Sequence, residues 1–185
     1  MIPDIVQDAE HKMKSAVEHA REEFAAIRTG RAHPAMFSKL MVDYYGSPTP
    51  LQQLATFQVP EARTVLISPF DRQSMSGIEK AIRDSDLGVN PANDGNVIRV
   101  VLPQLSEERR RDYVKVARTK AEEGRVAVRN IRRHANDSVH KLVKDKEVGE
   151  DDAHGAEKQL DGVTKKYVDS IDELLKSKEA ELLEV

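Results

Sequence analysis

Apolar residues recur every three or four positions in three long segments of the chain, a spacing that predicts amphipathic helices. The first segment covers residues 5–27 and stops before Gly30, the second covers 106–142, and the third covers 150–182 after a break at Gly149. Each helix is expected to exceed about 25 residues and to carry a narrow apolar stripe, as helices that pack side by side do. Together the segments predict a long antiparallel three-helix bundle.

The pattern changes between residues 31 and 103. Short runs rich in β-branched and apolar residues, bounded by Gly or Pro, predict strands at 40–45, 64–67 and 97–102. A short helix is predicted near residues 78–82. The fold class is therefore expected to be α+β, with a small mixed β/α/β domain inserted between the first and second helices of the bundle.

The insertion divides the predicted bundle in sequence. We expect residues 1–29 and 106–185 to form the bundle domain and residues 30–105 to form the small domain. The chain must cross between the domains twice, and both crossings contain Gly or Pro, which favours a two-strand hinge. A rigid junction whose linkers only turn corners is the alternative. The predicted hinge residues are Thr29, Gly30, Arg31, Ala32, Pro34, Leu102, Pro103, Gln104 and Leu105.

The second helical segment carries a line of arginines beside its apolar stripe. At 3.6 residues per turn they fall within about 60° of one another and extend along about 30 Å of helix. Guanidinium groups suit phosphate oxygens, so the line predicts a surface for a structured nucleic acid. This arginine row consists of Arg111, Arg118, Arg125, Arg129 and Arg132.

Charge is distributed unevenly along the chain. The whole protein has a net charge of −3, whereas residues 106–146 carry +6 and residues 147–185 carry −7. Concentration of positive charge on one element supports RNA binding, and an aromatic content of 4% indicates recognition by shape and backbone rather than by base stacking. The alternative is a solvated face whose arginines pair with acidic neighbours.

Nothing in the sequence predicts catalysis. The chain has no cysteine, its six histidines include no pair at i, i+4 spacing, and no glycine-rich phosphate loop is present. We therefore expect no enzyme activity, no metal site and no cofactor. The absence of cysteine, of a signal-peptide pattern and of about 20 consecutive apolar residues predicts a cytoplasmic protein without a membrane segment. A helical scaffold for partner proteins is the alternative to RNA binding.

Short motifs follow one another in a fixed order along the whole chain. They are IRTGRA at 27–32, YYG at 44–46, TPL at 49–51, FDR at 70–72, EKAI at 79–82, SDLG at 85–88, EERR at 107–110, VRNIRR at 128–133 and KEAEL at 178–182. None of them is decisive alone. In their order and spacing they make the chain resemble the bacterial ribosome recycling factor family.

The resemblance implies a fold and a function. The fold would be an L-shaped, tRNA-like arrangement of a three-helix bundle and a small β/α/β domain. The bundle would lie on large-subunit ribosomal RNA across the vacated tRNA sites, and elongation factor G with GTP would drive the ribosomal subunits apart. The implied protein is a cytoplasmic monomer that binds neither DNA nor a membrane and has no active site of its own.

The resemblance also implies site residues. The RNA-binding residues carried over from the family are Arg110, Arg129, Arg132 and Arg133, helped by Arg28 and Arg31. The remaining members of the arginine row, Arg111, Arg118 and Arg125, are candidates by geometry alone. Two alternatives stay open: Arg133 could pair with Asp137, and the arginines at 28 and 31 could anchor linker carbonyls instead of RNA.

Two positions depart from the family pattern. His134 stands where the family commonly has an acidic residue, so that end of the arginine row is less negative. Gly124 replaces a commoner Ala and should cost up to about 1 kcal/mol of helix stability, unless another backbone approaches closely there. Neither departure removes a residue expected to bind RNA.

Overall fold

The computed structural model describes residues 1–184 and divides into two compact units. The first unit contains Met1–Thr29 and the chain from Glu107 onward, and the second contains Gly30–Ser106. Each unit has its own hydrophobic core. The small unit is thus inserted into the sequence of the larger one.

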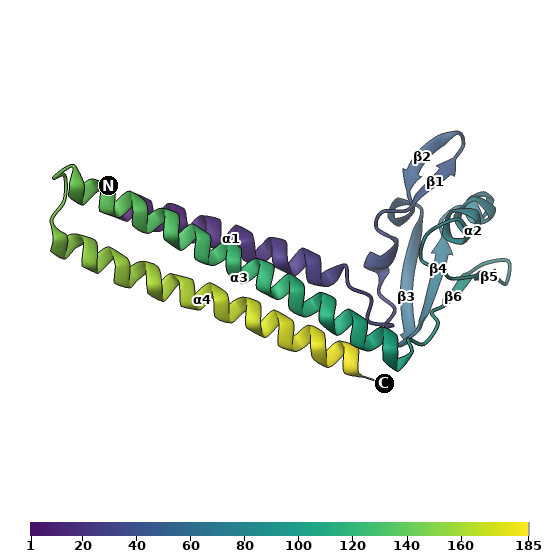
Figure 1. Ribbon diagram of the computed structural model, residues 1–185. Helices are drawn as coiled ribbons and strands as arrows, with labels where there is room; N and C mark the ends of the chain where they lie inside the picture. The colour runs from purple at the N-terminus through teal and green to yellow at the C-terminus, as the bar shows by residue number, and fades with distance from the viewer. Residues whose placement is uncertain (185) are drawn as a thin grey trace. The chain divides into compact units, whose positions relative to one another are not determined.

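The larger unit is a bundle of three helices, α1 (Ile2–Ala25), α3 (Glu107–Lys144) and α4 (Glu150–Leu183) (Figure 1). Each helix packs on both of the others, and the apolar stripes meet along the axis. The first helix, at 24 residues, is shorter than expected. The helix ends there because the amide of Ile27 donates to the carbonyl of Phe24, a tighter turn that still leaves the Ile27 side chain buried.

Gly124 on α3 lies where side chains of both neighbouring helices come close to its backbone. A Cβ added at this position would lie 3.1 Å from Cδ1 of Ile171 on α4 and 3.5 Å from Cβ of Ala20 on α1. The glycine therefore leaves room for side chains of both neighbouring helices. Its cost in helix propensity is offset by close packing at mid-bundle.

The small unit combines two antiparallel sheets with one helix (Figure 1). A hairpin of β1 and β2 stands apart from a four-stranded sheet of order β3-β4-β6-β5. The strands are β1 (Met41–Tyr44), β2 (Ser47–Pro50), β3 (Ala55–Glu61), β4 (Thr64–Pro69), β5 (Pro91–Asn93) and β6 (Ile98–Val101), and the helix is α2 (Met75–Arg83). Short 3₁₀ turns occupy Pro34–Phe37, Leu51–Gln53 and Arg72–Ser74.

Alternation of buried and exposed residues shows which strands build the core of the small unit. Val65 and Ile67 on β4 and Ile98 and Val100 on β6 are fully buried, with polar or less buried residues between them. The three strands expected from sequence correspond to β1, β4 and β6. The pattern misses β2, β3 and β5, because β2 and β5 are short and contain proline and β3 is exposed along most of its length.

Both chain crossings are tied to the small unit by backbone hydrogen bonds. The amide of Ala32 donates to the carbonyl of Ala62, and the amide of Leu102 donates to the carbonyl of Arg63, both at 2.7 Å. Gly30 has φ of +79°, and the Leu105 side chain packs so closely on it that an added Cβ would lie 3.3 Å from Leu105 Cγ. A side chain at this glycine would therefore be strained.

A tyrosine pair in the small unit is held by one carboxylate. The hydroxyls of Tyr44 and Tyr45 both donate to Oδ2 of Asp71 at 3.1 Å, and the backbone amide of Gln73 donates to its Oδ1 at 2.9 Å. Tyr45 adopts a left-handed φ of 52° and is 71% exposed. The contacts of Asp71 therefore fix the end of the β1–β2 hairpin against the turn that precedes α2.

We expect Asp71 to titrate below its ordinary value of 3.8. The amide of Gln73 and then the hydroxyl of Tyr44 lower its pKa, and the same carboxylate raises the pKa of both tyrosines above 10.0. A lowered carboxyl pKa stabilises the fold above pH 3.8, and the contribution is lost as the pH falls toward the folded-state pKa. Carbon-detected NMR titration should give a midpoint below 3.8 that rises in Tyr44→Phe. A midpoint at 3.8 or above would contradict the expectation.

Candidate nucleic-acid interface

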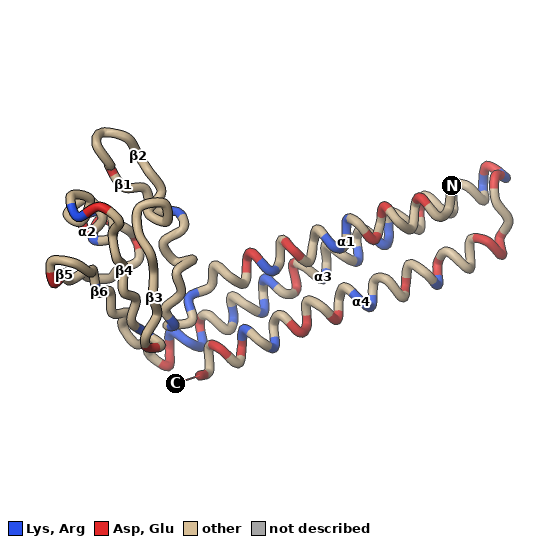
Figure 2. The backbone as a smooth tube through the Cα atoms, turned by 180° about the vertical axis from the view of Figure 1, so that it is seen from behind, with Lys and Arg blue, Asp and Glu red and all other residues tan. Residues whose placement is uncertain are grey.

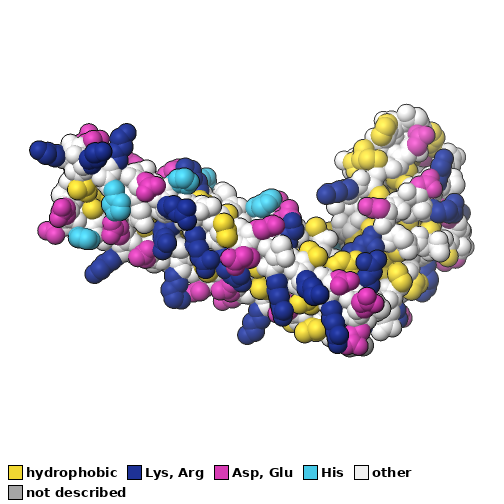
Figure 3. All heavy atoms as spheres, viewed as in Figure 1, with side chains coloured by type: hydrophobic (Ala, Val, Ile, Leu, Met, Phe, Trp, Pro, Cys, Tyr) yellow, Lys and Arg dark blue, Asp and Glu magenta, His cyan; other side chains and the backbone are white. Residues whose placement is uncertain are grey.

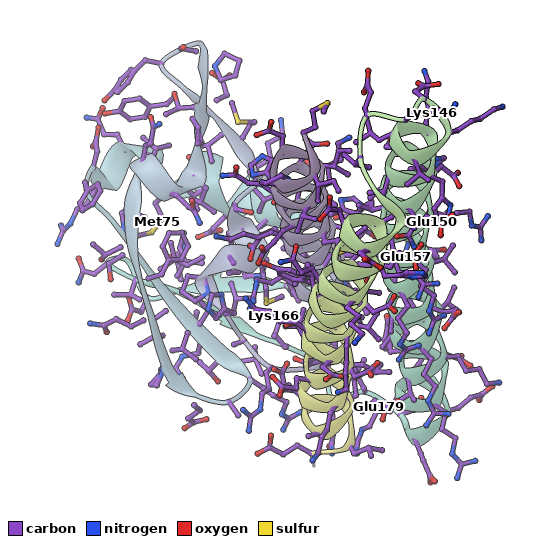
Figure 4. All side chains as sticks on the ribbon, turned by 90° about the vertical axis from the view of Figure 1, so that its left-hand side faces the viewer. Met75, Lys146, Glu150, Glu157, Lys166 and Glu179 are labelled. Atoms are coloured by element: carbon purple, nitrogen blue, oxygen red, sulfur yellow. The ribbon has the colours of Figure 1, made fainter. Side chains whose placement is uncertain are left out.

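The arginine row lies along the boundary between α3 and α4. Members seven residues apart reach across this boundary to carboxylates of α4, as charged residues flanking the seam of a coiled coil do. The contacts are Arg118 Nε to Glu179 Oε1 at 2.8 Å, Arg125 Nε to Asp172 Oδ1 at 2.7 Å, and Arg132 Nη1 to Asp161 Oδ1 at 3.4 Å. Figure 4 shows Glu179 on the α3 side of α4, whereas Lys166, the ion-pair partner of Glu10 on α1, lies on another side.

The rest of the row pairs within α3. Arg111 meets Glu107 at 2.6 Å, one turn earlier in the helix. Glu122 serves two arginines: its Oε2 lies 2.9 Å from Nη1 of Arg125, and its Oε1 lies 3.7 Å from Nη1 of Arg129. On the face of the bundle seen in Figure 3, basic side chains gather along its length, with acidic side chains among and beside them.

Burial separates a structural member of the row from accessible ones. The side chain of Arg125 is only 20% exposed and has two carboxylate partners. Burial lowers its pKa, but the hydrogen bonds to Asp172 and Glu122 outweigh that effect and raise the pKa above its ordinary value. Arg125 therefore holds α3 against α4, and its guanidinium group is less available to a ligand than those of more exposed arginines.

Arg129, Arg132 and Arg133 are the more available guanidinium groups. Arg129 is half exposed and its contact with Glu122 is long, at 3.7 Å. Arg132 has a single long ion pair together with a buried Nε that lacks a partner within residues 1–184. Arg133 is exposed and forms no ion pair or hydrogen bond with any residue described. The alternative pairing of Arg133 with Asp137 is thus not seen in the described chain.

The other candidate arginines are dispersed. Arg110 is half-buried and lines a hollow at one end of α3 together with Glu107, Arg111 and Leu183. Arg28 is exposed at the end of the first crossing and belongs to the bundle unit, whereas Arg31 is exposed and belongs to the small unit. The bundle surface is therefore defined by the arginines of α3.

The sequence gives residues 147–185 a net charge of −7, but it did not identify which carboxylates of this acidic segment pair with the arginine row. The carboxylates of Asp161, Asp172 and Glu179 sit on one face of α4, and Figure 2 shows acidic positions recurring along that helix beside the basic positions of α3. The signal was present, because Asp172 and Glu179 are seven residues apart, as Arg118 and Arg125 are. The register of α4 along α3, however, could not be predicted from the sequence.

A second charged cluster lies near the turn between α3 and α4. His140 Nε2 lies 2.6 Å from Oε1 of Glu157, and Nδ1 of His154 lies 3.7 Å from Oε2 of the same carboxylate. The contact with His140 lowers the pKa of Glu157 below its ordinary value. Within residues 1–184 no group of His, Asp or Glu side chains is arranged to hold a metal ion, and no helix is long and apolar enough to cross a membrane.

The fold and this surface define a class of protein: a long three-helix bundle that presents guanidinium groups at a helix boundary, with an α+β unit inserted after its first helix. A family model described as ribosome recycling factor matches residues 20–183. The chain belongs to the ribosome recycling factor family.

Relatives and solved structures agree over the full length. The chain is 72% identical over 182 residues to the ribosome-recycling factor of Cutibacterium acnes, covering 98% of this chain and 99% of the relative. It is 68% identical over 185 residues to that of Kineococcus radiotolerans, with both chains fully covered. A solution structure of the ribosome recycling factor is similar with a TM-score of 0.80 and 43% identity, covering 100% of this chain and 98% of that one.

A further solved structure places a relative in a complex. It describes the Thermus thermophilus ribosome recycling factor and the Escherichia coli elongation factor G bound to the E. coli post-termination complex. The present chain is similar to the factor in that structure with a TM-score of 0.68 and 41% identity, and both chains are fully covered.

Proposed function

We propose that this protein is a ribosome recycling factor. It binds the post-termination ribosome and, together with elongation factor G and GTP, promotes dissociation into subunits for a new round of translation. The observation that carries the proposal is similarity over the whole chain to factors of this name, one of them described in complex with elongation factor G on the post-termination ribosome.

The proposed contact is made by the bundle with large-subunit ribosomal RNA at the vacated tRNA sites. Arg129, Arg132 and Arg133 support this role because they are the guanidinium groups on α3 whose described partners are distant or absent. Guanidinium groups bind phosphate oxygens through two parallel hydrogen bonds, so they hold an RNA backbone without reading its sequence.

In this proposal the protein acts mechanically, as a cytoplasmic monomer without an active site or cofactor. Hydrolysis of GTP by the partner supplies the free energy. Bending at the two crossings is restricted to residues outside the hydrogen bonds of Ala32 and Leu102, since those bonds fasten both strands to the turn between β3 and β4. The proposed hinge is therefore short on each strand.

Sedimentation and subunit splitting test the proposed function together. The purified protein should co-sediment with post-termination ribosomes, and binding should weaken as salt rises because each phosphate contact releases counterions, by about 0.7 to 0.9 in log–log slope per contact. Addition of elongation factor G and GTP should then raise the yield of free subunits, and GTP omission should abolish the effect. Co-sedimentation that survives nuclease treatment and high salt, without splitting, would favour a protein scaffold instead.

A further inference from the structure

The arginine row is electrically neutral as folded. Its five guanidinium groups stand against five carboxylates at contact distances from 2.6 to 3.7 Å. Two of these carboxylates, Glu107 and Glu122, belong to α3, and three belong to α4. Within residues 1–184, the α4 carboxylates Asp161, Asp172 and Glu179 form ion pairs only with arginines of the row.

The ion pair of Arg132 with Asp161 is solvent-exposed, and an ion pair of this kind is weak and easily exchanged. Asp161 is 63% exposed and its arginine partner 42% exposed, so water screens their attraction. An RNA phosphate that replaces such a carboxylate makes a contact of similar strength and leaves the carboxylate to water. Exchange with one isolated phosphate is therefore close to neutral in free energy.

Folded RNA changes this balance. Where two strands bring phosphates close together, one guanidinium group meets more negative charge than a single carboxylate supplies. Exchange is then favourable at a structured RNA surface and stays close to neutral along a flexible single strand. The same row can thus discriminate between two RNAs that carry identical charge per nucleotide.

We propose that Asp161, Asp172 and Glu179 are specificity-determining residues that suppress binding of the bundle to unstructured RNA. They keep the more exposed Arg118 and Arg132 paired until a dense cluster of phosphates displaces the carboxylates, whereas Asp172 adds negative charge beside the half-buried Arg125. The inference rests on the proposed function, because the structured RNA in question is that of the ribosome. It assigns the α4 carboxylates a role in selectivity that is additional to the contact by which Asp172 and Arg125 hold α3 against α4.

Neutralising the three carboxylates tests the inference. The triple variant Asp161→Asn, Asp172→Asn, Glu179→Gln should bind poly(U) about tenfold more tightly at low salt, with a log–log salt slope steeper by about 2, since freed arginines now displace counterions. Its affinity for large ribosomal subunits should change less, so the ratio of the two affinities falls. Fluorescence anisotropy with labelled protein gives both affinities.

A matched variant separates local charge from net charge. Asp4→Asn, Asp8→Asn, Glu18→Gln also removes three exposed carboxylates, whose ion-pair partners all lie on α1 or at the N-terminus. This control should leave the affinity ratio near that of the unmodified protein. The single variant Asp161→Asn, which removes only one long ion pair, guards against misfolding of the triple variant and should shift the ratio in the same direction.

The outcomes are distinct. Unchanged or weaker poly(U) binding by both the triple and the single variant, with helicity intact, would overturn the inference and leave the carboxylates as braces. An equal rise in the α1 control would also overturn it, since net charge would then be the cause. If the unmodified protein binds large subunits in the same experiment, failure of the selectivity inference leaves the proposed function unaffected. If the unmodified protein fails to bind large subunits, both the inference and the proposed function are overturned.

Discussion

Reversal of charge at Arg129 and Arg133 together, R129E/R133E, should weaken binding to large ribosomal subunits by about 100-fold at moderate salt. Both side chains are exposed, and neither braces the core, so the fold should be retained. In the proposed complex this variant would lose two phosphate contacts and gain two repulsive charges. The log–log salt slope should fall by about 1.4 to 1.8.

A control of equal charge makes the result interpretable. Lys14 on α1 and Lys158 on α4 are exposed on the bundle, and neither has an ion pair in the described chain. The variant K14E/K158E changes the net charge by the same amount and should weaken subunit binding only slightly. Equal losses in the two variants, measured by sedimentation across a salt series, would show that net charge, not the α3 surface, governs binding.

Replacement of Gly124 by leucine should destabilise the bundle by about 2 to 3 kcal/mol, because overpacking a close-packed core forces backbone shifts. Even a single Cβ at this position comes within 3.1 Å of Ile171 and 3.5 Å of Ala20. Gly124→Ala should stay within about 1 kcal/mol of the unmodified protein, since the gain in helix propensity offsets a contact with the movable end of Ile171. Urea unfolding followed by helical circular dichroism measures both.

Gly162 supplies the comparison for this experiment. It also lies within a long helix, but a Cβ added there has nothing within 4 Å. Gly162→Leu should therefore stabilise the bundle by about 0.5 to 1 kcal/mol through helix propensity alone. If leucine were tolerated equally at both positions, close packing at mid-bundle would not be the reason for glycine at 124.

The helices could be predicted closely from sequence, whereas the surface between two of them could not. Periodicity predicted the ends of α3 and α4 to within a few residues, because an apolar stripe such as Ala117, Ala121 and Val128 must be buried against the other helices. The same angular reasoning placed Arg118 and Arg125 beside that stripe. The carboxylates that pair with these arginines depend on how far α4 is shifted along α3. That register is set by side-chain packing between the two helices as the bundle forms.

The small unit was harder for a related reason. β4 and β6 are recognisable because Val65 and Ile98 belong to runs that are buried at alternate positions. β2 and β5 are short strands held by hydrogen bonds to β1 and β6. Each contains proline, which strand propensity disfavours, so neither was predicted. At the crossings, glycine and proline marked where the chain turns but not that Ala32 and Leu102 are fastened to the next turn.

Insertion of the small unit after α1 also sets an order of assembly. During synthesis α1 emerges first, but both helices on which it packs, α3 and α4, follow Ser106. The apolar stripe of α1 therefore has no helix to pack against while the inserted unit is being synthesised. Residues Gly30–Ser106 form a compact unit with a hydrophobic core of its own, and domains of a nascent chain generally fold as units. The inserted unit therefore matures first, the α3–α4 hairpin closes next through its short connection, and the earliest-made helix docks last.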